Sequence, residues 1–267
     1  MSTLRILYTA SEISPFLETS AVANFVKALP RYMQEQELEV RILVPRFGVI
    51  NERKNRLHEV VRLSGTNISV GDDAAPLVIK VASIPQAKLQ VYFIDNEDYF
   101  KRKAVFYDKQ DKFFADNDAR MVFFCKGVLE TVKKLGWAPD IVHCHDWITS
   151  LLPLYLKTAY RQEPLFKKSK VIFTLYNNVF TPKLGQDLQE KAKMVGIKEE
   201  ALAPLASADF GGLIRTGLQH ADRVFSAEPL EDKAFEGVLP EEITCIENNE
   251  EGLAAYHKLY KELAGKR

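Results

Sequence analysis

The stretch Asp140-Ile141-Val142-His143-Cys144-His145-Asp146-Trp147 lies midway along the chain and decides how the rest is interpreted. Its first half is a short apolar run, typical of a buried parallel β-strand. Its second half gathers two imidazoles, a carboxylate and an indole where that strand should end. Ligands of open parallel α/β sheets bind beyond the carboxyl ends of the strands. The stretch therefore predicts both a central strand and the position of a functional site.

Strands and helices alternate on both sides of this stretch. Short apolar or β-branched runs predict strands at residues 4–10, 39–45, 170–175, 222–227 and 243–246. Apolar residues at helical spacing predict helices over residues 19–33, 118–135, 148–160, 211–220 and 249–264. Residues 186–204 look helical but polar, and another helix is expected near Pro229. Thr19 or Ser20 is available as the first N-cap, and Gly136 ends the second helix. This order indicates a doubly wound, Rossmann-like α/β domain with a mostly parallel sheet.

Residues 56–118 depart from the alternation. Four short runs between 57 and 94 predict extra strands or hairpins added to the parallel sheet. The segment that follows mixes charges with aromatic side chains, which are Tyr99, Phe100, Phe106, Tyr107, Phe113 and Phe114. Such side chains either stack on sugars or bury as packing, and we favour packing.

Composition argues against several classes of function. The 36 basic and 36 acidic residues cancel, so no net field favours nucleic acid or an anionic membrane. No apolar run approaches the ~18 residues of a membrane span. Cys125, Cys144 and Cys245 lack CxxC spacing, and we expect reduced, buried thiols in a cytoplasmic protein. The His and Asp residues lack metal-ligand spacing and the first loop lacks GxGxxG, so neither a metal nor a cofactor is expected.

Short motifs follow one another in a fixed order between residue 5 and about residue 227. They are Ala10-Ser11-Glu12 with Pro15-Phe16, Ala28-Leu29-Pro30, Arg46-Phe47 leading to Leu57-His58-Glu59-Val60, Asp116-Asn117-Asp118-Ala119-Arg120 with Phe123-Phe124, Leu135-Gly136-Trp137-Ala138-Pro139 running into the central stretch, and Ala221-Asp222-Arg223-Val224. In this order they resemble the amino-terminal half of bacterial glycogen synthases and plant starch synthases, the family 5 glycosyltransferases.

The resemblance implies a GT-B fold, in which two Rossmann-like domains face each other across a cleft. The acceptor glucan lies largely on the first domain and the nucleotide sugar on the second. Members transfer glucose from ADP-glucose or UDP-glucose to an α-1,4-glucan with retention, without a metal. We expect residues 1–247 to form the first domain and residues 248–267 a helix that packs back on it. We expect the nucleotide-sugar domain to be absent from these 267 residues.

The loop after the first strand departs from the family pattern. Members carry Lys-Thr-Gly-Gly-Leu-Ala-Asp, and this chain has Glu18-Thr19-Ser20-Ala21-Val22-Ala23-Asn24. Glycines there let backbone amides approach a phosphate at a helix start, and the lysine adds positive charge. Ser20 and Ala21 add bulk and Glu18 adds negative charge, which disfavours a donor diphosphate. The helix start could bind another anion or serve only as a cap.

The second departure is Tyr176-Asn177, where the family has His-Asn at a strand end. The family histidine contacts the transferring glucose, and tyrosine cannot present the same nitrogen donor and acceptor pair. His145 and Asp146 match the family motif, whose aspartate lies close to the reacting sugar. Asp146 either keeps that contact or caps the next helix.

The other central residues have less specific expectations. Buried packing is expected for His143 and Trp147. No residue is assigned as catalytic. The substrate-binding candidates are Glu12, Thr19, His145, Asp146 and Asn177.

Two functions remain open. One is a non-catalytic relative that binds an α-glucan, a nucleotide sugar or a protein partner. The other is an active glucosyltransferase completed by a donor domain on a separate chain. We predict no synthase activity for the isolated chain, because it lacks both the opposing wall and the lysine that hold an activated donor. The missing wall also predicts an exposed apolar face, and hence a homodimer or a hetero-complex.

Overall fold

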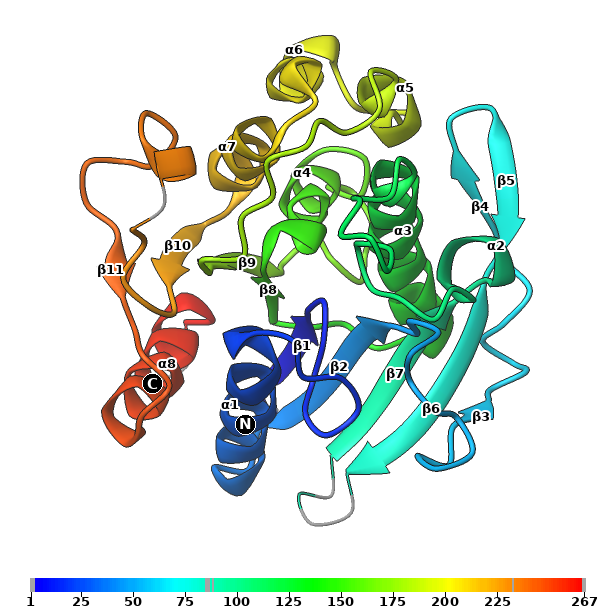
Figure 1. Cartoon of the computed structure of the whole chain (residues 1–267). Coiled ribbons are helices and arrows are strands. Elements are labelled where there is room, and N and C mark those ends of the chain that lie inside the picture. Colours follow the sequence, from blue (N-terminus) through cyan, green and yellow to red (C-terminus); the bar gives the residue numbers. More distant parts are fainter. Residues whose placement is uncertain (1–2, 85–86, 88, 232, 266–267) are drawn as a thin grey trace.

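The computed structural model describes residues 3–84, 87, 89–231 and 233–265. Within these residues the main sheet has the strand order β11-β10-β9-β8-β1-β2-β7-β6-β3 (Figure 1). The strands from β11 to β7 pair in parallel, whereas β6 and β3 add to the β7 edge in antiparallel fashion. The predicted α/β fold with a mostly parallel sheet is confirmed.

The parallel strands follow the predicted apolar runs. They are β1 (Arg5–Thr9), β2 (Glu39–Pro45), β7 (Leu89–Asp95), β8 (Ile141–His145), β9 (Lys170–Leu175), β10 (Arg223–Ser226) and β11 (Thr244–Cys245). The antiparallel additions are β6 (Val78–Ile84) and β3 (His58–Glu59), and β4 (Asn67–Val70) pairs with β5 (Asp73–Pro76) in a separate hairpin. The extra strands predicted between residues 56 and 95 are therefore present.

Helices cover both faces of the sheet. Helices α1 (Ala21–Glu35) and α8 (Glu250–Leu263) lie on one face, and α3 (Asn117–Leu135), α4 (Leu151–Lys157) and α7 (Phe210–His220) lie on the other (Figure 1). Shorter elements are α2 (Glu97–Phe100), α5 (Leu188–Ala192), α6 (Glu199–Leu202) and the 3₁₀ turns η1 (Trp147–Thr149), η2 (Ala203–Ser207) and η3 (Lys233–Phe235). The sheet thus lies between two helical layers.

The ends of the long helices carry the expected caps. Ser20 is the N-cap of α1, where its hydroxyl accepts a bond from the Val22 N–H. Gly136 ends α3 in the left-handed conformation with φ of 60°, which glycine adopts without steric cost. Helix α1 continues through Pro30 to Glu35.

Two apolar cores flank the sheet because side chains alternate along each strand. In β1, Ile6 and Tyr8 face α1 and α8, and Leu7 faces α3 and α4. Helix α8 inserts Tyr256 and Tyr260 into the first of these cores, and both are fully buried. The final helix is therefore packed directly on the sheet.

Three details differ from the sequence-based expectations. The predicted helix over residues 186–204 is split into α5, α6 and η2, because the chain turns between them at Gly196 with φ of 92°. The helix expected near Pro229 is replaced by the short turn η3 further along the chain. Cys245 is exposed, since β11 is a two-residue edge strand, whereas Cys125 and Cys144 are buried as expected.

Candidate functional site

The sheet has a topological switch point between β1 and β8. From β1 the chain moves outward through β2 to β7, and it then returns to place β8 on the other side of β1. Crevices form beyond the carboxyl ends of strands at such points, because the loops that follow diverge. Ser11 and Glu12 come after β1, and Asp146 comes after β8. The central stretch therefore ends where a ligand is expected.

Asp146 is held by three donors at this point. It is 2% exposed, and its Oδ1 accepts a 2.8 Å bond from the Trp147 N–H, which caps η1. Its Oδ2 accepts bonds from Ser11 Oγ at 3.2 Å and from Asn178 Nδ2 at 3.0 Å. Burial raises the pKa of Asp146 to about 7 despite these bonds, and the charge of Glu12 adds to the rise. Asp146 thus caps η1, which is one of the two roles left open for it, and its carboxyl pKa lies close to neutral.

The Glu12 carboxylate lies beside the start of α1 and binds the two residues that precede the helix. Its Oε2 accepts bonds from the Thr19 N–H at 2.7 Å and Thr19 Oγ1 at 2.6 Å. Its Oε1 accepts bonds from the Ser20 N–H at 2.7 Å and Ser20 Oγ at 2.5 Å. Glu18, in contrast, is exposed and accepts a bond from Ser14 Oγ at 2.7 Å. The carboxylate that satisfies the donors at this helix start is therefore Glu12 rather than Glu18.

His143 and His145 lie on the face covered by α1 and α8. His143 Nδ1 is 2.6 Å from Tyr260 Oη, and its Nε2 is 2.7 Å from Thr174 Oγ1. His145 Nδ1 is 2.8 Å from Tyr176 Oη. Burial lowers the pKa of His145 to about 3 and that of His143 well below its usual value, so both rings are neutral at pH 7. The packing role predicted for His143 is confirmed.

A cavity of about 410 Å³ opens beyond the ends of β1, β8 and β9. One group of its lining residues is polar and the other is largely aromatic. The described residues that line it are Ser11, Thr19, Val105, Phe106, Tyr107, Asp108, Asp111, Phe113, Trp147, Asn177, Asn178, Val179 and Phe180. Neither lysine nor arginine belongs to this set, so two aspartates carry the formal charge of the wall.

The structure separates the five substrate-binding candidates. Thr19 and Asn177 line the cavity, and Asp146 and Glu12 lie beneath it, bonded to lining residues. His145 is fully buried and packs against Phe25 of α1, with the ring centroids 5.8 Å apart. Its ring is therefore part of the core between the sheet and α1.

Two residues at the site, Asn178 and Tyr107, were not among the substrate-binding candidates predicted from the sequence. Asn178 donates to both Ser20 Oγ and Asp146 Oδ2 at 3.0 Å, and so connects α1 with the end of β8. Its position directly after the Tyr176-Asn177 pair was the available signal. Among the aromatic residues 99–114, Phe100 is buried as favoured, whereas Tyr107 is 37% exposed at the cavity.

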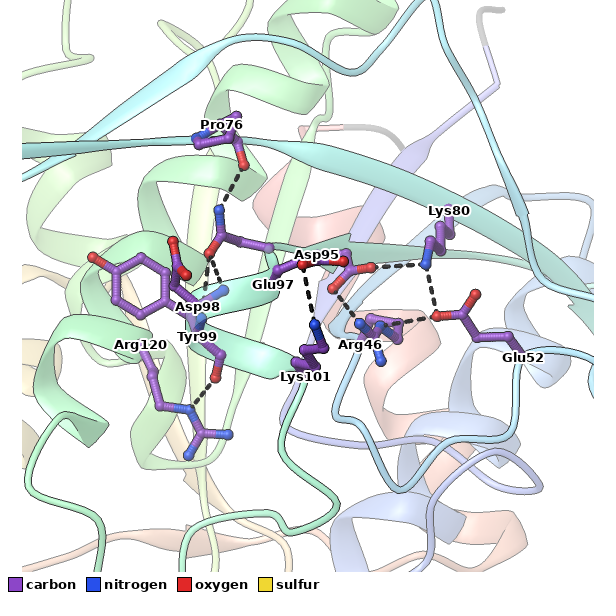
Figure 2. A network of polar contacts seen from close by, with 11 residues as sticks. Arg46, Glu52, Pro76, Lys80, Asp95, Glu97, Asp98, Tyr99, Lys101 and Arg120 are labelled. Atoms are coloured by element: carbon purple, nitrogen blue, oxygen red, sulfur yellow. Dashed lines mark hydrogen bonds and ion pairs between the residues drawn. The ribbon is translucent and has the colours of Figure 1, made fainter.

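A cluster of ion pairs connects β6 with the carboxyl ends of β2 and β7. Figure 2 shows Arg46 and Lys80 each paired with one carboxylate oxygen of Asp95, at 2.9 Å and 3.0 Å, and Glu52 contacts both cations. Burial opposes the charge of Lys80, but its bonds to Glu52 and Asp95 outweigh that effect and raise its pKa. Asp95 is the last residue of β7, so the segment that leaves this strand starts from a fixed point.

Other kinds of site find no support in the described ranges, 3–84, 87, 89–231 and 233–265. Nowhere in them do three His, Cys, Asp or Glu side chains gather in a way that could hold a metal ion. Nor does any helix in those ranges have the length and apolar character to cross a membrane.

Comparison with known proteins agrees with the motifs and the fold. The model of the starch synthase catalytic domain family matches residues 5–230. The glycogen synthase of Chlorobium luteolum is 40% identical over 228 residues, which cover 85% of this chain and 46% of that protein. The glycogen synthase of Chlorobium chlorochromatii is 38% identical over 247 residues, covering 89% of this chain and 48% of that protein. The chain thus spans about half the length of these relatives.

A solved structure shows the same fold. The catalytic domain of starch synthase IV from Arabidopsis thaliana, bound to ADP and acarbose, superposes with a TM-score of 0.68 at 18% identity. The match covers 85% of this chain and 45% of that one. Together with the family match over residues 5–230, these similarities show that the chain belongs to the starch synthase catalytic domain family, glycosyltransferase family 5.

Proposed function

We propose that this chain binds a neutral α-glucan in the cavity beyond β1, β8 and β9, and that it does not transfer glucose by itself. The lining of the cavity is the observation that supports this function. Aromatic faces lie beside hydroxyl, amide and carboxylate groups, and the described lining contains no lysine or arginine. This combination suits an uncharged, hydroxyl-rich ligand.

In the aromatic part of the lining, Tyr107 is 37% exposed and can stack on a sugar ring, whereas Trp147, Phe113 and Phe180 are buried and support it. Trp147 lies between Phe106 and Phe180, with ring centroids 4.6 Å and 4.9 Å away. Phe113 stacks on Phe180 at 5.0 Å, and Tyr107 extends the group toward solvent. Pockets of 300–1,000 Å³ with apolar walls and a few convergent polar groups are typical of small-molecule sites. A volume of about 410 Å³ therefore matches a short stretch of glucan.

The polar part of the lining provides partners for sugar hydroxyls. Asp108, Asp111, Asn177 and Asn178 supply carboxylate and amide groups. A carboxylate accepts hydrogen bonds from hydroxyls, and an amide both accepts and donates. A sugar hydroxyl can donate to the carboxylates and can also accept from the amides, because each hydroxyl is both a donor and an acceptor.

A nucleotide sugar fits the same surroundings poorly. The diphosphate of a nucleotide is recognised well at a helix start, where free N–H groups and the helix dipole favour an anion. Here the N–H groups of Thr19 and Ser20 are bonded to the Glu12 carboxylate. Asp108 and Asp111 add negative charge to the nearby wall. A phosphate at these two N–H groups would have to displace Glu12 and approach these acids.

The proposal of inactivity follows from the same local chemistry. Transfer requires an activated donor whose developing charge is stabilised by preorganised donors or cations. The cavity has no cation in its described lining, and Tyr176 stands where the family motif has histidine. The second candidate is an active glucosyltransferase completed by a donor domain on a separate chain, and the match of residues 5–230 to the starch synthase catalytic domain family favours it.

Calorimetry with maltoheptaose and with ADP-glucose tests the binding function. We expect saturable binding of maltoheptaose and none of ADP-glucose. Tyr107→Ala should weaken the binding, because Tyr107 lines the cavity. Tyr32→Ala is the control and should leave the binding unchanged, because the Tyr32 ring packs against His257 of α8. ADP-glucose binding without maltoheptaose binding would overturn the proposal.

Incorporation of labelled glucose from ADP-glucose into glycogen tests the proposed inactivity. We expect none from this chain alone. A rate comparable to that of a full-length synthase would contradict the proposal, and activity only after addition of a separate donor-domain chain would support the second candidate.

Association with a second copy or another protein also stays a proposal. Among the described residues, the exposed large apolar side chains are Val49, Val61, Tyr107 and Val195, which lie far apart in the sequence. Light scattering at high concentration separates a dimer from a monomer, and a monodisperse monomer would leave only a hetero-complex.

A further inference from the structure

One segment supplies much of the cavity wall and has little regular structure of its own. We define the aromatic segment as residues 99–114. It contributes six of the thirteen described lining residues, namely Val105, Phe106, Tyr107, Asp108, Asp111 and Phe113. Beyond the end of α2, its internal pairing consists of the bridge between Tyr107 and Phe113 and a few turn bonds. The shape of the wall must therefore come from outside the segment.

Arg120, in the first turns of α3, contacts the aromatic segment at two backbone carbonyls. Its side chain is buried, with the residue 1% exposed. Nε donates to the carbonyl of Tyr99 at 2.8 Å, a bond visible in Figure 2. Nη1 donates to the carbonyl of Val105 at 2.6 Å and to Asn117 Oδ1 at 2.6 Å. A planar guanidinium can bind several acceptors at once, because its N–H groups have a fixed geometry. One side chain thus connects both ends of the seven-residue stretch from Tyr99 to Val105.

The same guanidinium lies among aromatic rings. Its Cζ is 5.1 Å from the ring centroid of Phe47, 5.5 Å from Phe100, 5.6 Å from Phe114 and 6.0 Å from Phe106. Cations within about 6 Å of a ring face are attracted by its quadrupole, and the attraction grows when the site is desolvated. Three of these rings belong to the aromatic segment, so the cation also organises its side chains.

The charge of Arg120 persists in this environment. Burial, with a smaller effect of Arg102, lowers its pKa to about 9, and Asp116 partly offsets this. The group is therefore still protonated at pH 7. Its hydrogen-bond partners among the described residues are carbonyl and amide oxygens rather than a carboxylate.

Asn117, one turn earlier on α3, reinforces the attachment. Its Nδ2 donates to the carbonyl of Phe106 at 2.9 Å, and the Phe114 N–H donates to the same oxygen at 3.0 Å. Arg102 pairs with both carboxylate oxygens of Asp116, the N-cap of α3. The start of α3 therefore holds the segment on both sides of the residues that enter the wall.

From this geometry we propose that Arg120 is the positioning residue of the glucan cavity. By fixing the carbonyls of Tyr99 and Val105, it places Phe106 against Trp147 and so sets the aromatic wall. The inference rests on the proposed glucan binding. A purely structural role would instead make Arg120 one more contributor to overall stability, with no selective effect on the wall.

A single-tryptophan protein provides a selective readout. Trp137 and Trp147 are the two tryptophans, and Trp137→Phe leaves Trp147 as the only indole emitter. In this background Arg120→Met removes the donors while keeping a long side chain, and Arg120→Lys keeps the charge but not the fork. Lys126→Met is the matched control, because Lys126 is also a buried cation on α3 that donates to backbone carbonyls, of Ser69, Lys191 and Lys193.

Three measurements are compared across these variants. We expect Arg120→Met to shift the Trp147 emission to longer wavelength and to weaken maltoheptaose binding about tenfold, the equivalent of one strong hydrogen bond. Trypsin should cut faster within the aromatic segment, at Lys101, Arg102, Lys103, Lys109 and Lys112. Arg120→Lys should give intermediate values, and Lys126→Met should change none of the three.

Each outcome is decisive for one of the two proposals. Unchanged emission and cleavage in a folded Arg120→Met protein, or equal changes in Lys126→Met, would overturn the positioning role. If Arg120→Met does not fold, Arg120→Lys and Asn117→Ala give the same comparison. If the starting protein fails to bind maltoheptaose, the proposed function falls, while emission and cleavage still decide whether Arg120 positions the wall.

Discussion

The phenolic oxygen of Tyr176 lies 2.8 Å from Nδ1 of His145, at the adjacent ends of β9 and β8. Both side chains are buried, and both pack against Phe25 of α1. The family motif has histidine at position 176, where the resemblance implies a contact with the transferring sugar. In this chain the strand end supplies a phenol to the core.

Tyr176→Phe tests how strongly this pair contributes to stability. The substitution removes the partner of His145 Nδ1, and Nε2 of the same ring has no partner in the described structure. A buried polar group left unpaired costs about 1–3 kcal/mol, and we expect that loss in urea unfolding. Tyr92→Phe, which loses only a bond to the exposed Gln90, should change stability by less than about 0.5 kcal/mol. Equal effects would contradict the role given to the pair.

Glu12 and Glu18 form a matched pair for testing which carboxylate stabilises the start of α1. Glu12→Gln keeps the size of the side chain but replaces one acceptor oxygen with an amide NH2 group. This donor would then face the N–H and hydroxyl donors of Thr19 or Ser20. We expect a loss of about 1.5–3 kcal/mol, the range for hydrogen bonds to charged groups. Glu18→Gln should cost less than about 0.5 kcal/mol, since Glu18 is exposed. Thermal and chemical unfolding measure both, and a larger effect at Glu18 would reverse our assignment.

The raised pKa of Asp146 gives stability a defined pH dependence. Below about pH 4 the carboxyl group is protonated in both states, using its usual value for the unfolded chain. Between that pH and about 7 the unfolded chain releases the proton and the folded protein keeps it, so rising pH favours unfolding. The contribution is on the order of 4 kcal/mol across this window, because one pKa unit corresponds to about 1.4 kcal/mol.

Asp146→Asn provides the reference for this measurement. The buried His143 and His145 have lowered pKa values and contribute the opposite slope, but they do so in both proteins. We expect the stability of the wild type relative to Asp146→Asn to fall as pH rises from 4.5 to 7.5. A difference that stays constant, or that rises with pH, would show that Asp146 is ionised in the folded protein throughout.

Two glycines of α7 test the packing of that helix on β9. A Cβ on Gly217 would lie 2.4 Å from Cε1 of the fully buried Phe173, whereas one on Gly211 would meet Val238 Cγ2 at 3.4 Å. Gly217→Ala should destabilise by about 1–3 kcal/mol through overpacking. Gly211→Ala should be neutral or stabilise by up to about 1 kcal/mol, the usual helix preference for alanine. Melting temperatures that rank the two in reverse order would refute this packing.

The sequence predicted those parts of the fold that depend on local pattern. The apolar runs around Ile6 and Val142 identified β1 and β8, because a strand buried on both faces must be almost continuously apolar. The same argument predicted that polar residues at adjacent strand ends gather together, and Ser11 does contact Asp146. Caps such as Ser20 were visible because few residue types satisfy a helix start.

The cavity wall could not be predicted in the same way. Residues 99–114 have no periodicity, and their arrangement depends on Arg120, a residue type that is rarely buried. The orientation of His145 was also hidden, because alternation shows that His143 and His145 share a face but not which face is covered by α8. The bonds from Glu12 to the α1 start join residues seven and eight positions apart through a loop without a pattern of its own.

The uneven burial of the three cysteines has a practical consequence. Burial raises the pKa of Cys144 to about 12 and that of Cys125 well above its usual value, so neither presents a thiolate near neutral pH. Cys245 lies exposed on the β11 edge. A maleimide dye would therefore label one position of the native protein, and unfolding would reveal the other two, so counting attached dyes by mass would report the folded fraction directly.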